Sequence, residues 1–353
     1  MGKPKTIALV GLGSAARRIH LPAYAKLGDL KIVAGVETAP GMTRWPFPVF
    51  TSLDEMLATA KPDIVAVITP PRSHFGITLT ALNAGCHVLC EKPFMMSLEE
   101  ADEVIETATR AGRLVAVNNE FRFMRSHLAA KAQIGRPGFG KLQFISINQT
   151  FHVTEATETG WRGEDTRRTA QDFGPHTFDL CRYFFDEDPL SIRARMPRGA
   201  RPNGPDYLNL IELEFSGDRV AHITLDRLSR GPHRYLEMRL DGEAGCIETS
   251  LGGKLEVTAG VRGGTRRPFF GLDVAMGGRA RLYHGESFSL LATDPLDVFA
   301  DATSRLMAAF LGAIDSGTTP PCDAVDNRHV LALMLAAYQS DAERRPIAVS
   351  PSR

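Results

Sequence analysis

The sequence predicts a two-domain α/β protein, in which a parallel sheet covered by helices on both faces precedes an α+β domain with a large, mostly antiparallel open sheet. The chain has 353 residues, more than a single hydrophobic core usually supports. Up to about residue 122, apolar strands alternate with helical segments, as in parallel sheets. Beyond that point, runs of β character follow one another with short turns. We therefore expect domains at 1–122 and 123–353, with the terminal helix free to pack back on the first.

The composition excludes several classes of partner. Lys plus Arg and Asp plus Glu each total 41, so the formal net charge is zero and no overall field attracts nucleic acid or an anionic membrane. No apolar run approaches the ~20 residues of a membrane span, and no signal peptide pattern opens the chain. Five scattered cysteines without a CxxC pair favour reduced thiols in a cytoplasmic enzyme. A small molecule is the expected partner.

The first strand leads into a glycine turn. Residues 6–10 (TIALV) are apolar, and Gly11–Ala16 (GLGSAA) precedes a helical stretch that continues to about Leu27. In a strand–turn–helix unit of this type, Gly11 permits the tight turn, Gly13 lets the backbone approach a pyrophosphate, and Ala16 lets the helix pack on the strand. The pattern predicts a Rossmann dinucleotide-binding domain. Its cofactor-binding residues here are Gly11, Leu12, Gly13, Ser14 and Ala15.

A carboxylate ends the second strand. Residues 31–37 (KIVAGVE) place Glu37 at the strand end, 21 residues after Ala16 (37 minus 16), where an acid that binds the ribose hydroxyls is expected. Such a carboxylate repels a 2′-phosphate, so the sequence favours NAD as cofactor over NADP. Arg44 is the opposing signal, because a nearby arginine accommodates that phosphate if its loop folds back.

The remaining elements follow the same reasoning. In the first domain the sequence predicts helices at 52–58, 74–84 and 98–111 and strands at 63–68, 86–91 and 114–118. Ser97 with Glu100 forms a capping box, and Gly112 terminates that helix. The second domain is expected to hold a helix near 126–133, strands at 142–153, 190–196, 208–215, 219–228, 234–241 and 246–250, and helices at 295–314 and 324–342. The glycine-rich part from Gly260 to Gly278 is expected to be a long loop.

Lys92 stands at the carboxyl end of the buried strand CHVLCE, where open α/β sheets bind their ligands. Far downstream, Asp172, His176 and Asp179 are spaced i, i+4 and i+7, so they share one face if that segment is helical. A cation, a carboxylate and an imidazole together suit proton transfer and charge stabilisation at an alcohol or carbonyl oxygen. The alternative is a structural His176 bonded to one of the aspartates. No metal is expected, because no second histidine or cysteine lies nearby.

The chain resembles the Gfo/Idh/MocA family of nicotinamide-dependent oxidoreductases over essentially its full length. The resemblance rests on four segments: GLGSAA, TPPRSHFGITLTALNAGCHVLCEKP, NNEFRF and DFGPHTFD. It implies that Lys92, Asp172 and His176 form the catalytic set, with His176 taking the hydroxyl proton and Lys92 stabilising the oxyanion. It also implies a cis peptide bond before Pro93.

The resemblance extends the set of expected ligand contacts. Further cofactor-binding residues would be Thr69, Pro70, His74, Glu91, Lys92 and Asn118, and substrate-binding residues would be Lys92, Arg122, Trp161, Arg162, Asp172 and His176. Residues 167–171 (RRTAQ) depart from the glycine triplet that many members carry before the aspartate. The arginines of 162–168 therefore either recognise an anionic substrate through bidentate contacts or form a solvated basic loop.

The predicted function is an NAD-dependent oxidoreductase that transfers hydride between nicotinamide and a secondary alcohol or carbonyl of a carbohydrate-like substrate: a sugar, a polyol or a sugar acid. Two alternatives remain. One is an NAD-assisted glycosidase acting by transient oxidation, and the other is a non-catalytic dinucleotide sensor, which would require a broken catalytic set. The resemblance also implies a homodimer or homotetramer. The sequence does not specify the substrate.

Overall fold

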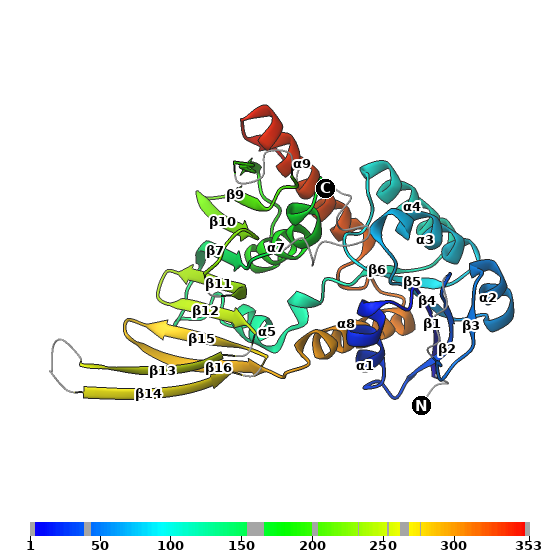
Figure 1. Cartoon of the computed structure of the whole chain (residues 1–353), viewed down its shortest axis with the longest axis horizontal. Helices are drawn as coiled ribbons and strands as arrows, with labels where there is room; N and C mark the ends of the chain where they lie inside the picture. The colour runs from blue at the N-terminus through cyan, green and yellow to red at the C-terminus, as the bar shows by residue number, and fades with distance from the viewer. Residues whose placement is uncertain are drawn as a thin grey trace.

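The computed structural model describes residues 4–38, 44–153, 166–199, 204–231, 233–252, 254–261, 268–275 and 277–349. Two sheets dominate it (Figure 1): a six-stranded sheet built by the N-terminal part and a nine-stranded sheet built by the later part. The predicted fold class is thereby confirmed. None of the described helices is long and apolar enough to cross a membrane.

The first sheet is parallel and has the order β3-β2-β1-β4-β5-β6. The chain moves outward from β1 to β3 and then returns to the other side of β1 with β4, so the strand order reverses between β1 and β4. At such a point the carboxyl ends of the strands leave a crevice for a ligand. The strands are β1 (Lys5–Val10), β2 (Leu30–Val36), β3 (Val49–Phe50), β4 (Ile64–Val67), β5 (His87–Cys90) and β6 (Val115–Val117).

Helices cover both faces of this sheet, which is why its central strands are continuous apolar runs. The expected ends of α4 are confirmed: Ser97 Oγ accepts a hydrogen bond from the Glu100 amide at 3.2 Å, and Gly112 adopts a positive φ of 60°. The Glu100 carboxylate in turn accepts from the Met96 amide at 2.9 Å. The helical elements are η1 (Ala16–His20), α1 (Leu21–Tyr24), α2 (Leu53–Ala60), η2 (Pro71–Ser73), α3 (His74–Asn83) and α4 (Leu98–Ala111).

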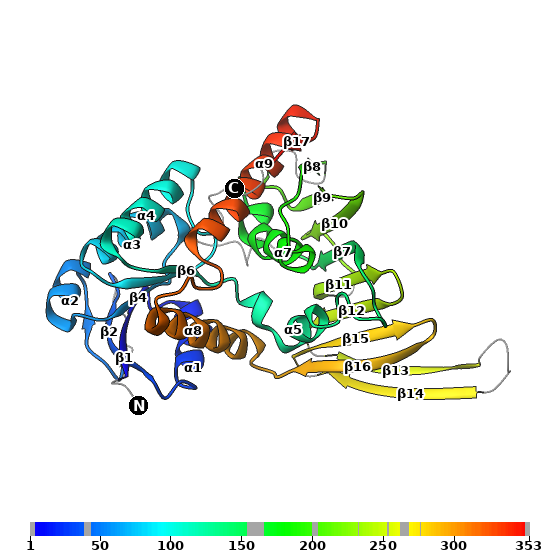
Figure 2. The same cartoon turned by 180° about the vertical axis from the view of Figure 1, so that it is seen from behind.

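The second sheet has the order β16-β15-β12-β11-β7-β10-β9-β8-β17. Only β7 and β10 pair in parallel among its described strands. Helix α7 (Thr169–Phe185) lies on the face toward the first sheet, and the views show no described helix on the other face (Figures 1 and 2). The strands are β7 (Leu142–Thr150), β8 (Ser191–Arg195), β9 (Leu208–Phe215), β10 (Arg219–Asp226), β11 (Arg234–Gly242), β12 (Cys246–Leu251), β15 (Gly278–His284), β16 (Ser287–Asp294) and β17 (Ile347–Ala348).

The expected long loop at Gly260–Gly278 is wrong for its described part. A hairpin of β13 (Lys254–Val261) and β14 (Pro268–Ala275) occupies much of this region, paired from Lys254 with Ala275 to Val261 with Pro268. The hairpin extends away from the body near the β16 edge (Figures 1 and 2). Glycine density suggested irregular structure, but cross-strand hydrogen bonding along the whole hairpin outweighs the low strand propensity of glycine.

The last two helices return to the first sheet. Helix α8 (Val298–Ser316) packs against η1 and α1, and α9 (Ala324–Glu343) packs against α4 and β6. Arg328 at the start of α9 donates to Asp102 on α4 at 2.8 Å. Between the sheets, η3 (Glu120–Phe123) and α5 (Arg125–Lys131) carry the chain from β6 toward β7. The second sheet is therefore fixed against the first by segments before and after it.

Candidate active site

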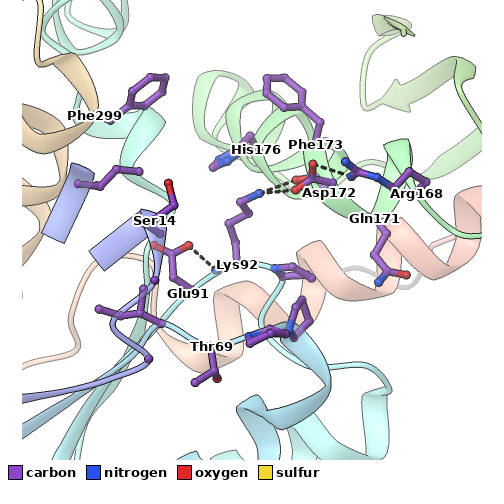
Figure 3. Close-up of a pocket in the computed structure, with 18 of the residues that line it drawn as sticks. Ser14, Thr69, Glu91, Lys92, Arg168, Gln171, Asp172, Phe173, His176 and Phe299 are labelled. Atoms are coloured by element: carbon purple, nitrogen blue, oxygen red, sulfur yellow. Dashed lines mark hydrogen bonds and ion pairs between the residues drawn. The ribbon is translucent and has the colours of Figure 1, made fainter. Parts of the chain in front are cut away.

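A cavity of about 730 Å³ lies at the carboxyl ends of the parallel strands, between the first sheet and α7. Lys92 points from the first sheet toward Asp172, with His176 beside it (Figure 3). Most of the residues predicted from the sequence line this one cavity: Gly11, Gly13, Ser14, Ala15, Glu37, Thr69, Pro70, Glu91, Lys92, Asp172 and His176.

The glycine turn has the geometry that a dinucleotide requires. Gly11 has a φ of +93°, and a Cβ there would lie 2.8 Å from the backbone oxygen of Ile68, so only glycine fits. A Cβ at Gly13 would meet nothing within 4 Å, which leaves this side of the turn open to a ligand. The Leu12 amide donates to Glu37 Oε2 at 3.0 Å, while the Leu12 side chain is buried in the core. The turn and the end of β2 are thus joined directly.

Glu91, just before Lys92, is held by two side chains from other elements. Its Oε1 atom lies 2.7 Å from His20 Nε2 and accepts from Asn118 Nδ2 at 2.8 Å. The other ring nitrogen of His20 lies 2.8 Å from the Tyr24 hydroxyl. Burial opposes ionisation of Glu91, but the bonds and charges of His20, Lys92 and Asn118 outweigh it and lower its pKa. This acid therefore enters the site as an anion.

The buried His74 side chain holds the loop that follows Glu91. The Lys92–Pro93 peptide bond is cis, as the resemblance implies. The ring of buried His74 lies between the backbone oxygens of Pro93, at 3.0 Å from Nδ1, and of Thr69, at 2.9 Å from Nε2. Lys92 Nζ then donates to the backbone oxygen of Asp172 at 2.7 Å and to its Oδ1 at 3.0 Å. His74 and Asn118 thus lie behind the cavity lining, where they support its wall.

The Asp172 carboxylate accepts hydrogen bonds from three cationic side chains. Besides Lys92 on Oδ1, its Oδ2 atom accepts from Arg168 at 2.8 Å and from Arg227 at 3.0 Å. Burial favours the neutral acid, yet Lys92, Arg227 and Arg168 together hold the pKa of Asp172 well below its usual range. The Asp172 carboxylate therefore stays charged and orients the lysine, and no described hydrogen bond joins it to His176.

His176 is oriented by aromatic packing. Its ring is stacked on Phe121, with centroids 3.9 Å apart, and meets the edge of Phe173 at 5.5 Å. Burial and the nearby Lys92 charge lower its pKa well below the usual range, so the imidazole is neutral near pH 7. Its Nδ1 atom has no hydrogen-bond partner. A neutral imidazole beside a lysine can accept a proton.

Other predicted residues lie elsewhere. Arg122 does not line the cavity: its guanidinium contacts Asp179 at 2.5 Å and Asp326 at 2.8 Å. The same arginine therefore occupies the one described cluster with metal-ligand spacing, Asp179, Cys322 and Asp326. Trp161 and Arg162 lie outside the described residues.

The two other arginines of the basic segment have defined places. Arg168 binds Asp172, and the Arg167 guanidinium lies 5.0 Å from the ring centre of Tyr338. Both line the cavity, where Arg168 is buried and Arg167 is exposed.

Several cavity residues escaped the sequence prediction. Glu120, Gln149, Arg227, Tyr235 and Phe299 all line the site. Four of them come from the second domain or its return helix, and no local motif marks them. Glu120 lies inside the NNEFRF segment that supports the resemblance. That segment marks the region of the site, but it does not single out Glu120 as a cavity residue.

Comparisons with known proteins agree with this architecture. Residues 5–119 match the model of an oxidoreductase family with an NAD-binding Rossmann fold, and residues 127–248 match the GFO/IDH/MocA C-terminal domain. The 1,5-anhydro-D-fructose reductase of Ensifer adhaerens is 33% identical over 83% of this chain and 81% of that enzyme. The D-glucoside 3-dehydrogenase of Escherichia coli is 31% identical over 51% of this chain. That alignment, like those to two uncharacterized oxidoreductases of Schizosaccharomyces pombe, spans about half of the relative's length, 54% or 55%.

A solved structure extends the likeness to the whole fold. The myo-inositol 2-dehydrogenase of Lactobacillus plantarum superposes with a TM-score of 0.80 at 19% identity, covering 99% of this chain and 100% of that one. The expected NAD cofactor is confirmed by the model that matches residues 5–119, and the expected fold family is confirmed by both models. The chain belongs to the Gfo/Idh/MocA family of oxidoreductases, with its NAD-binding Rossmann domain at the N-terminal end.

Proposed function

We propose that this protein catalyses NAD-dependent transfer of hydride between nicotinamide and a secondary alcohol or carbonyl of a sugar, polyol or sugar acid. The observation that carries the proposal is the meeting of Lys92, Asp172 and His176 in the cavity that also holds the glycine turn. A charged amine and a neutral imidazole beside one another are the groups that oxidation of an alcohol requires.

The chain's own residues support a dinucleotide in this cavity. The turn at Gly11 and Gly13 would take the pyrophosphate, and Glu37 would accept from the ribose hydroxyls. Thr69 and Pro70 would line the path from there toward Lys92. Bound NAD would supply the hydride acceptor, which the protein's side chains cannot provide.

The roles of the side chains follow from their charges. Lys92 would donate to the reacting oxygen and stabilise negative charge on it as it develops. His176, kept neutral by burial and by Lys92, would take the hydroxyl proton. Asp172 would hold the lysine in place, since its carboxylate already contacts Nζ at 3.0 Å. Reduction of a carbonyl runs these proton movements in reverse.

Several further features belong to the proposal. Relatives named for a glucoside, 1,5-anhydro-D-fructose, apiose and inositol support a carbohydrate-like substrate.

We place the domain boundary at residue 122, between the two segments that match the family models. We also propose a cytoplasmic homodimer or homotetramer, for which the face of the second sheet without a described helix is the candidate contact (Figures 1 and 2).

The test is a screen of purified protein with NAD⁺ or NADP⁺ against methyl β-D-glucoside, D-glucose, myo-inositol, xylitol and D-gluconate, following nicotinamide reduction by absorbance. Lys92→Ala and His176→Ala should each lower turnover roughly a thousandfold while NAD⁺ binding is kept. Lys141→Ala, at an exposed position, is the control. Near-normal turnover in both site variants would contradict the assignment. Release of sugar from the glucoside without net NADH would favour the glycosidase, and cofactor binding without any reaction would favour the sensor.

A further inference from the structure

Glu120 places a buried carboxyl in the wall of the same cavity. It is the first residue of η3, directly after β6 and just before the Phe121 that stacks on His176. Its side chain is buried, and its Oε2 atom has no hydrogen-bond partner. Burying an unpaired polar group costs free energy, so native proteins rarely leave one unless a ligand or water completes it. A cavity that binds a polyhydroxylated molecule supplies such a partner.

The surroundings of Glu120 raise the pKa of its carboxyl group. Burial and the charge of Glu91 raise its pKa, while Lys92 opposes the rise and Asp179 adds to it. A carboxylic acid that keeps its proton near neutral pH donates one hydrogen bond and accepts others, like the hydroxyl groups that it would meet. A carboxylate could only accept.

Aromatic rings line the same cavity and contact Phe121, the residue after Glu120. Phe299 lies 5.9 Å from Phe121 and 5.6 Å from Tyr235, and Tyr235 lies 5.6 Å from Phe173, measured between ring centres. Phe173, Tyr235 and Phe299 line the cavity together with Glu120. In a ligand site, polar groups that converge beside aromatic walls fix the orientation of a small ligand.

We propose that Glu120 is a specificity-determining residue, which hydrogen-bonds a substrate hydroxyl other than the one whose oxygen meets Lys92. The inference rests on the proposed function and adds to it a second point of contact from the first domain. Two contacts on one substrate, Lys92 at the reacting oxygen and Glu120 at another hydroxyl, select which carbon is presented for reaction. The substrate class is therefore a polyol or cyclic sugar with at least two hydroxyl groups.

The experiment compares Glu120→Ala, Glu120→Gln and the exposed control Glu106→Gln with the wild type, using whichever compound of the screen above gives the fastest NADH formation. Loss of a hydrogen bond to a buried group should raise KM roughly tenfold to a hundredfold in Glu120→Ala, with the Kd for NAD⁺ unchanged. Glu120→Gln keeps a donor and an acceptor, so its KM should rise less. Thermal unfolding of each variant shows whether it is folded. If Glu120→Ala is not, the kinetics of Glu120→Gln decide the question.

Monodeoxy analogues of the same compound separate a direct contact from a structural role. If Glu120 binds one hydroxyl, the wild type loses kcat/KM with the analogue that lacks it, and Glu120→Ala shows no further loss with that analogue alone. The inference would be overturned if Glu120→Ala lowered kcat/KM by the same factor with every analogue, or if both Glu120 variants kept wild-type kinetics. Either result would leave the proposed function standing. If no compound reduces either cofactor, the proposed function fails first and the inference fails with it.

Discussion

The ring of Phe121 lies face to face with the imidazole of His176, with the two planes only 5° from parallel and the centroids 3.9 Å apart. No hydrogen bond to His176 Nδ1 assists this orientation. Packing of Phe121 in η3 and Phe173 in α7 against the ring therefore sets the direction of the imidazole. That direction decides whether a proton can be transferred along a productive line.

Phe121→Leu should reduce kcat by about tenfold, because the smaller side chain lets the His176 ring rotate. The Kd for NAD⁺ should not change. Phe139→Leu is the matched control, since Phe139 is equally buried but does not contact His176. Both changes should lower the free energy of unfolding by about 1 kcal/mol, measured with urea. Equal kcat values in the two variants would show that the stacking has no role in turnover.

Asp172→Asn should both inactivate and destabilise the protein. The change removes the one negative charge shared by Lys92, Arg168 and Arg227, and an uncompensated buried charge costs about 3 kcal/mol. Chemical denaturation measures the loss. Asp315→Asn provides the comparison, because its pair with Lys5 is exposed and should contribute less than about 1 kcal/mol. Similar losses at the two positions would contradict the electrostatic account.

Glu37→Ala should weaken NAD⁺ binding and strengthen NADP⁺ binding. The Glu37 carboxylate holds the Leu12 amide at 3.0 Å, so its removal loosens the glycine turn and also removes the charge that repels a 2′-phosphate. Side-by-side titrations of both cofactors, read by protein fluorescence, give the ratio of the two Kd values. A wild type that already prefers NADP⁺ would show that Glu37 does not set the preference.

Acid should destabilise the fold partly through His176. Burial and Lys92 lower its pKa well below the usual range in the folded protein, whereas the unfolded chain binds this proton below about pH 6.5. The unfolded state therefore binds more protons in acid, and stability falls as the pH drops through 6.5, by about 1.4 kcal/mol per pH unit for each such group. Urea titrations at pH 7.5, 6.5 and 5.5 measure the slope. His176→Asn should make the slope of unfolding free energy against pH shallower. An unchanged slope would show that other groups cause the loss of stability in acid.

Local patterns were sufficient for much of the fold. The capping residues of α4, the glycine turn and the strand that ends just before Lys92 were all predicted, because each depends on neighbours within a few residues. Helix α7 also follows its sequence period and presents Asp172 and His176 to the cavity. These are features for which propensity, patterning and packing agree.

Features that depend on distant pairing were missed. Arg227 reaches Asp172 across 55 positions of the chain, and Arg122 finds Asp179 and Asp326 instead of the cavity. The β13–β14 hairpin forms from a glycine-rich stretch because its two strands pair with each other. For the two arginines the deciding partner lies outside any local window, and a single sequence carries no signal for it. The hairpin pairs neighbouring segments and was missed because glycine density suggested a loop.

The return of α8 has a consequence for how the protein can fold and be divided. Leu306, Met307 and Phe310 of this helix belong to the same buried cluster as Ile7 and Leu9 of β1. The nucleotide-binding half therefore lacks part of its own interior until the segment that forms α8 has been synthesised. A truncated chain ending near residue 122 would expose that apolar surface and aggregate, so an autonomous N-terminal fragment would have to carry α8 grafted on by a linker.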